Sequence, residues 1–294
     1  MDMKVILLTL LAIFGIYFLV VFVKDLVKNK ESRKDEENKV VVASVSGFLT
    51  NFFDALGIGS FGPLTAFIKI FKIADDRVIP GTLNVSCTIP VILEAFLFIK
   101  SIEVSPTTLI SMIISATIGA TIGAKFVSKL DEKKIELIMG ISLLVVVVLM
   151  LFSQFGILPV GGTDIGLTGG KLVIAVVINF FLGALMTVGI GLYAPCMALV
   201  FALGMSPKVA FPIMMGSCAF LMPSASIKFI KSGAYAAKSS VAISIFGCIG
   251  VLIATYLVKS LPLKILTWLV IVVILYTSIT MFKSYKDKSK VENK

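Results

Sequence analysis

The chain has 294 residues, of which 58% are hydrophobic and 15% are charged, and its mean hydropathy is +1.05. A soluble domain is nearer half apolar and a quarter charged, so this composition excludes an ordinary soluble domain and indicates a polytopic membrane protein. The net charge of +10 does not imply a nucleic-acid partner, because most basic residues flank apolar spans, where they determine topology. Histidine is absent, and the four cysteines lie inside apolar segments without a C-x-x-C motif, so we expect no metal, disulfide or cofactor.

The first predicted element is a helix over residues 3–23, an apolar run of about membrane-spanning length. Lys24 and Asp25 follow this run in place of a small-residue cleavage site, which favours a retained helix over a signal peptide. The stretch from Lys24 to Lys39 mixes both charge signs, as a solvated linker does. We therefore expect residues 1–39 to form a transmembrane helix and a charged cytoplasmic linker.

The rest of the chain contains eight more apolar segments, at residues 40–71, 78–99, 107–124, 135–153, 172–203, 209–227, 239–258 and 265–282. A glycine-rich loop at 154–170 divides them into two groups, and a basic tail follows at 283–294. The loop lacks the Gly-Lys-Ser/Thr ending of a phosphate-binding loop, so we interpret it as a connection between the groups.

The two groups look like copies of one unit. At an offset of 132, Leu56–Pro63 falls on Val188–Pro195 and Pro80 falls on Pro212, and the resemblance extends over 44–153 and 174–282. A duplicated membrane unit with a glycine break at the same place in each half is typical of a transporter whose site lies between the repeats. We therefore expect a first repeat at 40–153 and a second at 171–282.

Two of the apolar segments, 40–71 and 172–203, have 32 residues each, whereas a bilayer core needs about 20. Each carries a Gly-x-Gly-x-x-x-Pro break, where glycine frees the backbone and proline ends helices. Each segment either crosses the membrane once and projects beyond it, or enters, breaks and returns to the same side as a re-entrant hairpin.

The basic residues favour the hairpin. With single crossings, Lys and Arg number 16 inside and 11 outside; with hairpins they number 21 inside and 6 outside, out of 27. The larger asymmetry fits the tendency of basic residues to stay in the cytoplasm. Each repeat then has a hairpin and three transmembrane helices, an odd number of crossings, so the repeats are inverted. The prediction is an all-α protein of the cell membrane, with its N-terminus outside and its C-terminus cytoplasmic.

The hairpin tips are the candidate binding site. Pro63 and Pro195 suit the first turn of a short helix after each tip, and two helix N-termini facing each other would attract an anion. The alternative is that the tip glycines only allow close helix packing. The helices that follow the hairpins supply hydroxyl, amide and thiol groups as a second wall. The candidate substrate-binding residues are Gly57, Gly59, Ser60, Asn84, Cys87, Thr88, Gly189, Gly191, Tyr193, Cys196 and Ser217.

Two acidic residues lie within the apolar zone, where a carboxylate is costly and usually functional. Asp54 precedes the first tip by one turn, so it is either a coupling residue that binds a proton or a cap for free N–H groups at the helix break. Glu94 shares a helix face with Asn84, Cys87 and Thr88, so it either belongs to the second wall or simply lies near the outer surface.

The tips resemble the sulfite exporter TauE/SafE family of membrane transporters. The matching residues are Gly47-Phe48, Leu56-Gly57-Ile58-Gly59, Pro63, Ile118–Ala124, Gly189-Ile190-Gly191, Pro195 and Ser206–Ala210. Ser60-Phe61 replaces two family glycines, and Ala74-Asp75-Asp76 replaces a family Ser-Pro. The resemblance covers about residues 40–282 and implies transport of sulfite, sulfonates or related small anions.

The sequence thus predicts a secondary transporter in the lipid bilayer that moves a small anion by alternating access, with proton coupling and one repeat rocking against the other. A passive anion channel is the first alternative. An integral membrane enzyme is less well supported, because the chain lacks histidine, a Gly-x-Ser-x-Gly elbow and a paired acidic motif.

Overall fold

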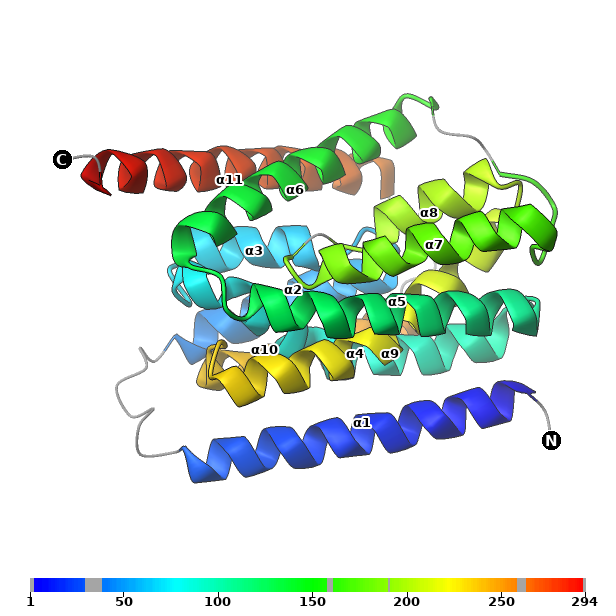
Figure 1. Cartoon of the computed structure of the whole chain (residues 1–294), viewed down its shortest axis with the longest axis horizontal. Coiled ribbons are helices and arrows are strands. Elements are labelled where there is room, and N and C mark those ends of the chain that lie inside the picture. Colours follow the sequence, from blue (N-terminus) through cyan, green and yellow to red (C-terminus); the bar gives the residue numbers. More distant parts are fainter. Residues whose placement is uncertain (1–2, 30–38, 158–160, 190, 258–262, 293–294) are drawn as a thin grey trace.

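A computed structural model describes residues 3–29, 39–157, 161–189, 191–257 and 263–292 (Figure 1). These residues form helices and no named strand, and eight of the helices are long and apolar enough to cross a membrane. The predicted all-α polytopic membrane fold is confirmed. The helices, in chain order, are α1 (Met3–Lys28), α2 (Val40–Ala55), α3 (Phe61–Ile70), the short 3-10 helix η2 (Asp76–Val78), α4 (Ile79–Ser101), α5 (Pro106–Val127), α6 (Glu132–Gln154), α7 (Gly169–Met186), α8 (Tyr193–Ala202), α9 (Pro207–Ser232), α10 (Ala237–Leu257) and α11 (Leu263–Glu292).

The same order of helices occurs twice in the chain. A broken pair and three long helices, α2–α3 with α4, α5 and α6, are followed by α7–α8 with α9, α10 and α11. The packing follows the same correspondence: α4 packs on its counterpart α9, and α6 packs on its counterpart α11. The boundaries of the predicted repeats and their inversion across the membrane stay predictions.

Each broken segment turns back on itself. The Lys39 Nζ donates a hydrogen bond to the Lys72 carbonyl oxygen at 2.8 Å, which joins the start of α2 to the end of α3. The Lys171 Nζ donates to the Leu203 carbonyl oxygen at 3.1 Å and joins the start of α7 to the end of α8 in the same way. A single straight crossing would put these groups at opposite ends of the molecule, so the hairpin interpretation of both segments agrees with the structure.

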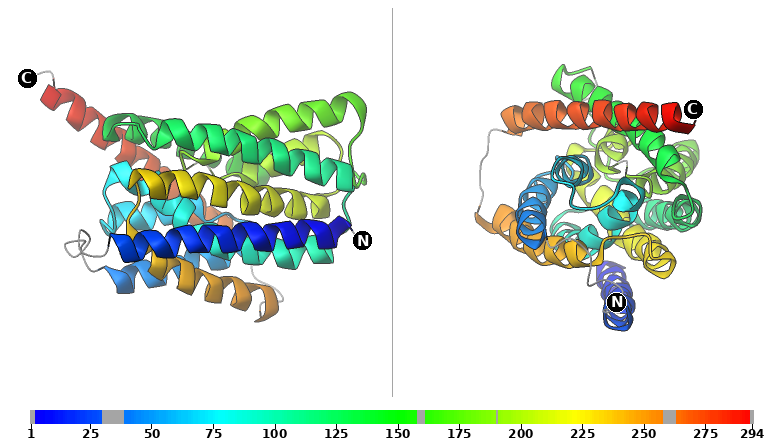
Figure 2. Two further views of the ribbon diagram at one scale, coloured as in Figure 1. Left: turned by 60° about the horizontal axis from the view of Figure 1, so that its bottom comes forward. Right: turned by 90° about the vertical axis from the view of Figure 1, so that its left-hand side faces the viewer.

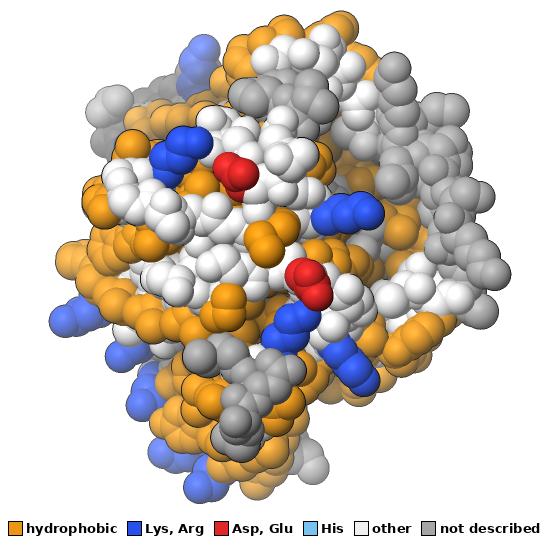
Figure 3. All heavy atoms as spheres, turned by 90° about the vertical axis from the view of Figure 1, so that its right-hand side faces the viewer, with side chains coloured by type: hydrophobic (Ala, Val, Ile, Leu, Met, Phe, Trp, Pro, Cys, Tyr) orange, Lys and Arg blue, Asp and Glu red, His pale blue; other side chains and the backbone are white. Residues whose placement is uncertain are grey.

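The molecule has two ends, which we name by the termini. At the tail end, α2 begins and α11 finishes (Figure 2), and Lys69 at the end of α3 bonds the Ser284 hydroxyl at 2.9 Å. At the N-terminal end, α1 and α7 begin, and the Ser206 amide bonds the Asp164 carbonyl oxygen at 2.8 Å. Charged side chains are sparse on the N-terminal end (Figure 3). The loops that the charge count assigns to the cytoplasm meet at the tail end.

The two hairpins are anchored to helices from the other half of the chain. On α2, a methyl group at Gly47 would lie 2.6 Å from the Ile243 Cα of α10. On α5, a methyl group at Gly119 would overlap the Phe180 carbonyl oxygen of α7. Small residues let helix backbones approach this closely in membranes. Each hairpin is therefore packed against the opposite half, α2 on α10 and α7 on α5.

The first and last helices run further than the apolar pattern predicts. α1 continues to Lys28, packs on α9 and α4, and is held at the tail end by the Tyr235 hydroxyl, which donates to Asp25 Oδ2 at 2.5 Å. α11 continues through the basic tail to Glu292. The extensions are charged, so a prediction from apolar runs ends these helices too early.

Candidate functional site

The first break lies between α2 and α3. α2 ends at Ala55, and the Gly57 amide bonds the Asp54 carbonyl oxygen at 2.8 Å in the turn that closes the helix. Gly57 and Gly59 have φ angles of +86° and +95°, a conformation that side chains with a Cβ rarely adopt. The turn aims the N-terminus of α3 at the molecular centre, with Pro63 in the first turn as the sequence predicts.

The second break has the same construction. α7 ends at Met186, the Gly189 amide bonds the Met186 carbonyl oxygen at 3.0 Å, and Gly189 has a φ of +111°. α8 begins at Tyr193, with Pro195 in its first turn. The predicted tip includes Ile190, which lies outside the described residues. Both breaks thus reverse the chain inside the fold and begin a ten-residue helix there.

The two breaks meet at a small buried cavity of about 10 Å³, close to the least space that holds one water molecule. A methyl group at Gly191 would lie 3.9 Å from the Phe61 Cβ, so the second tip faces the start of α3. The cavity is lined by the last turns of α2 and α7, the starts of α3 and α8, and side chains of α4 and α9: Asp54, Gly59, Ser60, Phe61, Val91, Met186, Gly191, Leu192, Tyr193 and Cys218.

Asp54 occupies the N-terminus of α3. Its side chain is buried, and Oδ1 accepts a hydrogen bond from the Ser60 amide at 2.6 Å. Ser60 is the residue before the first turn of α3, so the carboxyl group lies where an anion would meet the helix. The second oxygen, Oδ2, has no hydrogen-bond partner. The hydrogen bond from the Ser60 amide to Asp54 is the contact expected of a helix cap. It leaves Oδ2 free to bind a proton.

Of the two interpretations of Glu94, the place near the outer surface is wrong. Its side chain is completely buried in α4, and Oε2 accepts a hydrogen bond from the Tyr193 hydroxyl at 2.8 Å. Oε1 has no hydrogen-bond partner. α8 is folded back into the centre, and its first residue, Tyr193, meets Glu94 there. Tyr193, a predicted tip residue, therefore connects the second hairpin to an acidic group.

The predicted substrate-binding residues divide into two sets. Gly59, Ser60, Gly191 and Tyr193 line the central cavity together with Asp54. The others surround it without lining it. Gly57 faces Phe211 and a separate apolar cleft, Gly189 contacts Met139, and Cys87 and Cys196 are fully buried.

Two of the polar residues of the predicted second wall, Thr88 and Ser217, bond to other helices. Thr88 of α4 lies 3.0 Å from the Ser226 hydroxyl of α9, and Ser217 of α9 accepts from Asn179 Nδ2 of α7 at 3.2 Å. Asn84 donates to the Pro80 carbonyl oxygen within α4, and its Oδ1 has no partner. Interhelical bonding of this kind is the structural alternative to substrate contact.

Sequence reasoning missed Val91 and Met186 as cavity residues, whereas Cys218 belongs to the second wall that it expected on the helix after the second hairpin. Val91 and Met186 are ordinary apolar side chains, so nothing in their chemistry marks them. Cys218 follows Ser217, and its thiol lies 3.6 Å from the Met186 sulfur. Met186 occupies the place that corresponds to Asp54 at the repeat offset of 132, so the alignment itself carried this signal.

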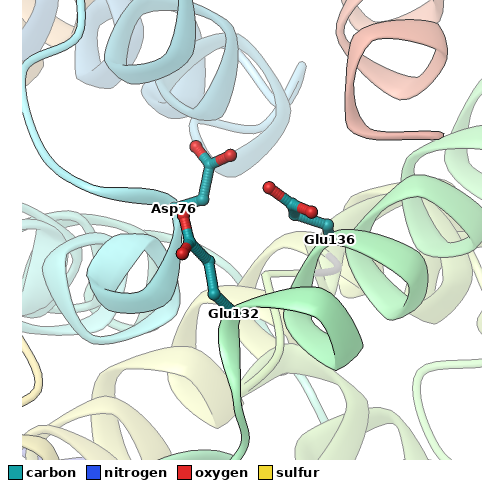
Figure 4. A group of neighbouring side chains, drawn as sticks. All are labelled: Asp76, Glu132 and Glu136. Atoms are coloured by element: carbon teal, nitrogen blue, oxygen red, sulfur yellow. The ribbon is translucent and has the colours of Figure 1, made fainter. Parts of the chain in front are cut away.

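A second group of acidic residues lies at the tail end (Figure 4). Oxygen atoms of Asp76 in η2 and of Glu132 and Glu136 on α6 lie within 4.8 Å of one another. Lys288 of α11 bonds Glu132 Oε1 at 2.6 Å and Glu136 Oε1 at 2.8 Å, and Lys69 of α3 pairs with Asp76. With a lysine on each carboxyl group, we interpret this cluster as an ion-pair network that ties α3, η2, α6 and α11 together.

A family model described as sulfite exporter TauE/SafE matches residues 2–152 and 171–294 of the chain. Neither the curated proteins nor the solved structures include a match. The matched ranges leave out the first residue and residues 153–170, which contain the glycine-rich loop, and they include both breaks and every residue of the central cavity.

Proposed function

Because the chain belongs to the sulfite exporter TauE/SafE family, we propose that this multi-pass membrane protein is a secondary active transporter of a small anion, a sulfur oxyanion such as sulfite or a sulfonate. One observation carries the proposal beyond the family: two helix N-termini, those of α3 and α8, meet at one buried cavity in the centre of the fold.

Helix N-termini can bind an anion without a buried cation. The first amides of a helix have no partner within the helix, and the helix dipole adds positive potential at the same place. In α3 these are the amides of Phe61 and Gly62, and in α8 those of Tyr193 and Ala194, because the next residue in each is proline. Four N–H groups from two directions suit the oxygen atoms of a small oxyanion.

The cavity also supports a mechanism with moving parts. Its volume of about 10 Å³ is too small for an anion of four or more heavy atoms, so the two tips must separate for substrate to reach it. Ser60 N–H is already bonded to Asp54, so substrate and ionised Asp54 compete for the same place. A proton on Asp54 would remove that competition, and we propose Asp54 as a coupling residue on this ground.

We propose that each of the two rigid bodies that move contains helices from both halves of the chain. Rocking one repeat as a block would pull α2 from α10 and α7 from α5, where the backbones are in closest contact. A motion that keeps these pairs, with α2 and α10 in one body and α5 and α7 in the other, separates the tips at lower cost. The repeats are inverted in this proposal, with the tail end in the cytoplasm.

The test is counterflow in liposomes containing the purified chain. Liposomes loaded with unlabelled sulfite should take up labelled sulfite transiently above its outside concentration, because a carrier exchanges one anion for another. With the membrane potential clamped at zero, a passive channel gives no such overshoot. Competition by thiosulfate, sulfonates and carboxylates then ranks the substrates. If none of these anions exchanges or competes, the assignment of a small-anion carrier is wrong.

A further inference from the structure

The centre of the fold holds two acidic side chains and no compensating charge. Asp54 and Glu94 are both buried and close enough to interact electrostatically. Across the described part of the chain, neither carboxyl group has a lysine or arginine partner. The other titratable groups facing them are Tyr193 of α8 and the thiols of Cys87, Cys218 and Cys248 on α4, α9 and α10. Phenol and thiol groups are ordinarily neutral at physiological pH.

Two unpaired carboxylates cannot both stay ionised in such a place. Burying one ionised group without a partner is costly, and a second like charge nearby adds to the cost. Each carboxyl group is built in the same way, with one oxygen accepting a hydrogen bond and the other left free. For Asp54 the donor is the Ser60 amide and Oδ2 is free; for Glu94 the donor is Tyr193 and Oε1 is free. The free oxygens are the places where protons would reside.

The two groups belong to different parts of the mechanism. Asp54 precedes the tip of the first hairpin, whereas Glu94 lies on α4 and is bonded to the first residue of α8 in the second hairpin. Separation of the tips would therefore change the surroundings of both groups at once. Breaking the Tyr193–Glu94 bond removes the donor to Glu94, and opening the cavity admits water to Asp54.

We propose that Glu94 is a second proton-binding site, so that two protons accompany each anion, one on Asp54 and one on Glu94. This inference rests on the proposed function. On one side of the membrane both carboxylates take a proton and the anion binds at the helix N-termini; on the other side the anion and both protons leave. A singly charged anion then crosses with a net charge of +1.

The test measures the sulfite concentration ratio across the membrane at equilibrium, so a variant that transports slowly still reaches the same ratio. Liposomes containing the full chain are clamped at zero potential with potassium and valinomycin, and the sulfite gradient that balances a pH gradient of about one unit is measured. Each coupled proton multiplies that gradient roughly tenfold. Sulfite binds protons itself, but this adds the same factor to every variant, so the comparison between variants is the readout.

Glu94→Gln and Asp54→Asn should each lower the balanced gradient about tenfold, and the double variant about 100-fold. Glu94→Asp, which keeps a carboxyl group, should retain the wild-type gradient. Glu103→Gln removes an exposed acid after α4 and is the matched control. A wild-type gradient in Glu94→Gln overturns the inference, and so does a gradient driven by sodium rather than by pH.

Failure of the proposed function would look different, because wild-type protein would then show no sulfite counterflow at equal pH. A second measurement does not depend on transport. Infrared spectra of the purified protein near neutral pH should contain absorption from buried protonated carboxyl groups, and Glu94→Gln should remove one component. Identical spectra for wild type and Glu94→Gln would also overturn the inference.

Discussion

Gly59 and Gly191 hold matching places in the two tips but differ in what the backbone requires. Gly59 has a φ of +95° and open space where a Cβ would lie, whereas Gly191 is outside the left-handed region and, among the described residues, a Cβ there would meet the Phe61 Cβ at 3.9 Å. A side chain at Gly59 therefore strains the backbone, and a side chain at Gly191 does not. Substitutions at these two glycines therefore distinguish effects on folding from effects on substrate binding.

Gly191→Ala should leave the thermal stability close to wild type and reduce sulfite counterflow, because the added methyl group projects toward the space between the tips. Gly59→Ala should lose about 1–2 kcal/mol of stability from the positive φ. Thermal unfolding of both purified variants is compared with their counterflow rates. Wild-type counterflow in Gly191→Ala would mean that Gly191 serves packing only.

Tyr193→Phe should destabilise the protein by about 1–3 kcal/mol, because Glu94 loses its hydrogen-bond donor while remaining buried. Tyr256→Phe, at an exposed position on α10, is the matched control and should leave stability unchanged. The measurement is the unfolding temperature in detergent. Equal unfolding temperatures for the two variants would show that the Tyr193–Glu94 bond contributes nothing to the fold.

The tip residues could be predicted from the sequence because glycine and proline restrict the backbone in known ways. Gly59, Ser60, Gly191 and Tyr193 were predicted, and the structure brings them to one cavity. The place of Glu94 could not be predicted, since it depends on how deeply α8 folds back toward α4. Helical spacing gives the face of a residue on its own helix but not the element that covers that face.

At the scale of elements, segment length and charge together predicted the hairpins. The segments 40–71 and 172–203 are too long for one crossing and too short for two, and basic residues mark the end to which the first returns. The ion pairs at the tail end could not be predicted, because Lys288 lies in a polar stretch with no apolar pattern. It meets α6 only through the packing of α11.

Lys288→Met should destabilise the tail end strongly, because it leaves the fully buried Glu136 without its lysine. Lys134→Met is the control, since it removes an exposed lysine from exposed Asp131, where water screens the ion pair. The Lys134 side chain lowers the pKa of Asp131, so that contribution is present at neutral pH and lost as the pH falls through the lowered pKa. Unfolding is therefore compared at pH 7. Equal losses in the two variants would contradict a role for Lys288 in the fold.

At the scale of the whole molecule, the contacts group the loops into two ends, and the sequence assigns the tail end to the cytoplasm. Lys39 reaches Lys72 and Tyr235 reaches Asp25 at one end, while Lys4 reaches the Ile102 carbonyl oxygen at the other. The sequence could predict this grouping from charge alone. It could not predict that the halves are interlocked, because the glycines on α2 and α5 do not identify their partner helices.

Single cysteines introduced into a cysteine-free background test the orientation in intact cells. Thr163→Cys, in the exposed glycine-rich loop, should react with a membrane-impermeant maleimide. Lys129→Cys, in the exposed turn between α5 and α6, should react only after the cells are opened. Labelling of Lys129→Cys in intact cells would reverse the assignment of the two ends.

The packing of α2 on α10 also has a consequence for how the protein is made. Synthesis runs from the N-terminus, so α2 and the first tip leave the ribosome long before α10 exists. During that interval the face around Gly47 and the buried carboxyl group of Asp54 lack their native neighbours. The first half must therefore wait in the membrane, covered by lipid or by the insertion machinery, and the first hairpin completes its packing only after α10 has been inserted.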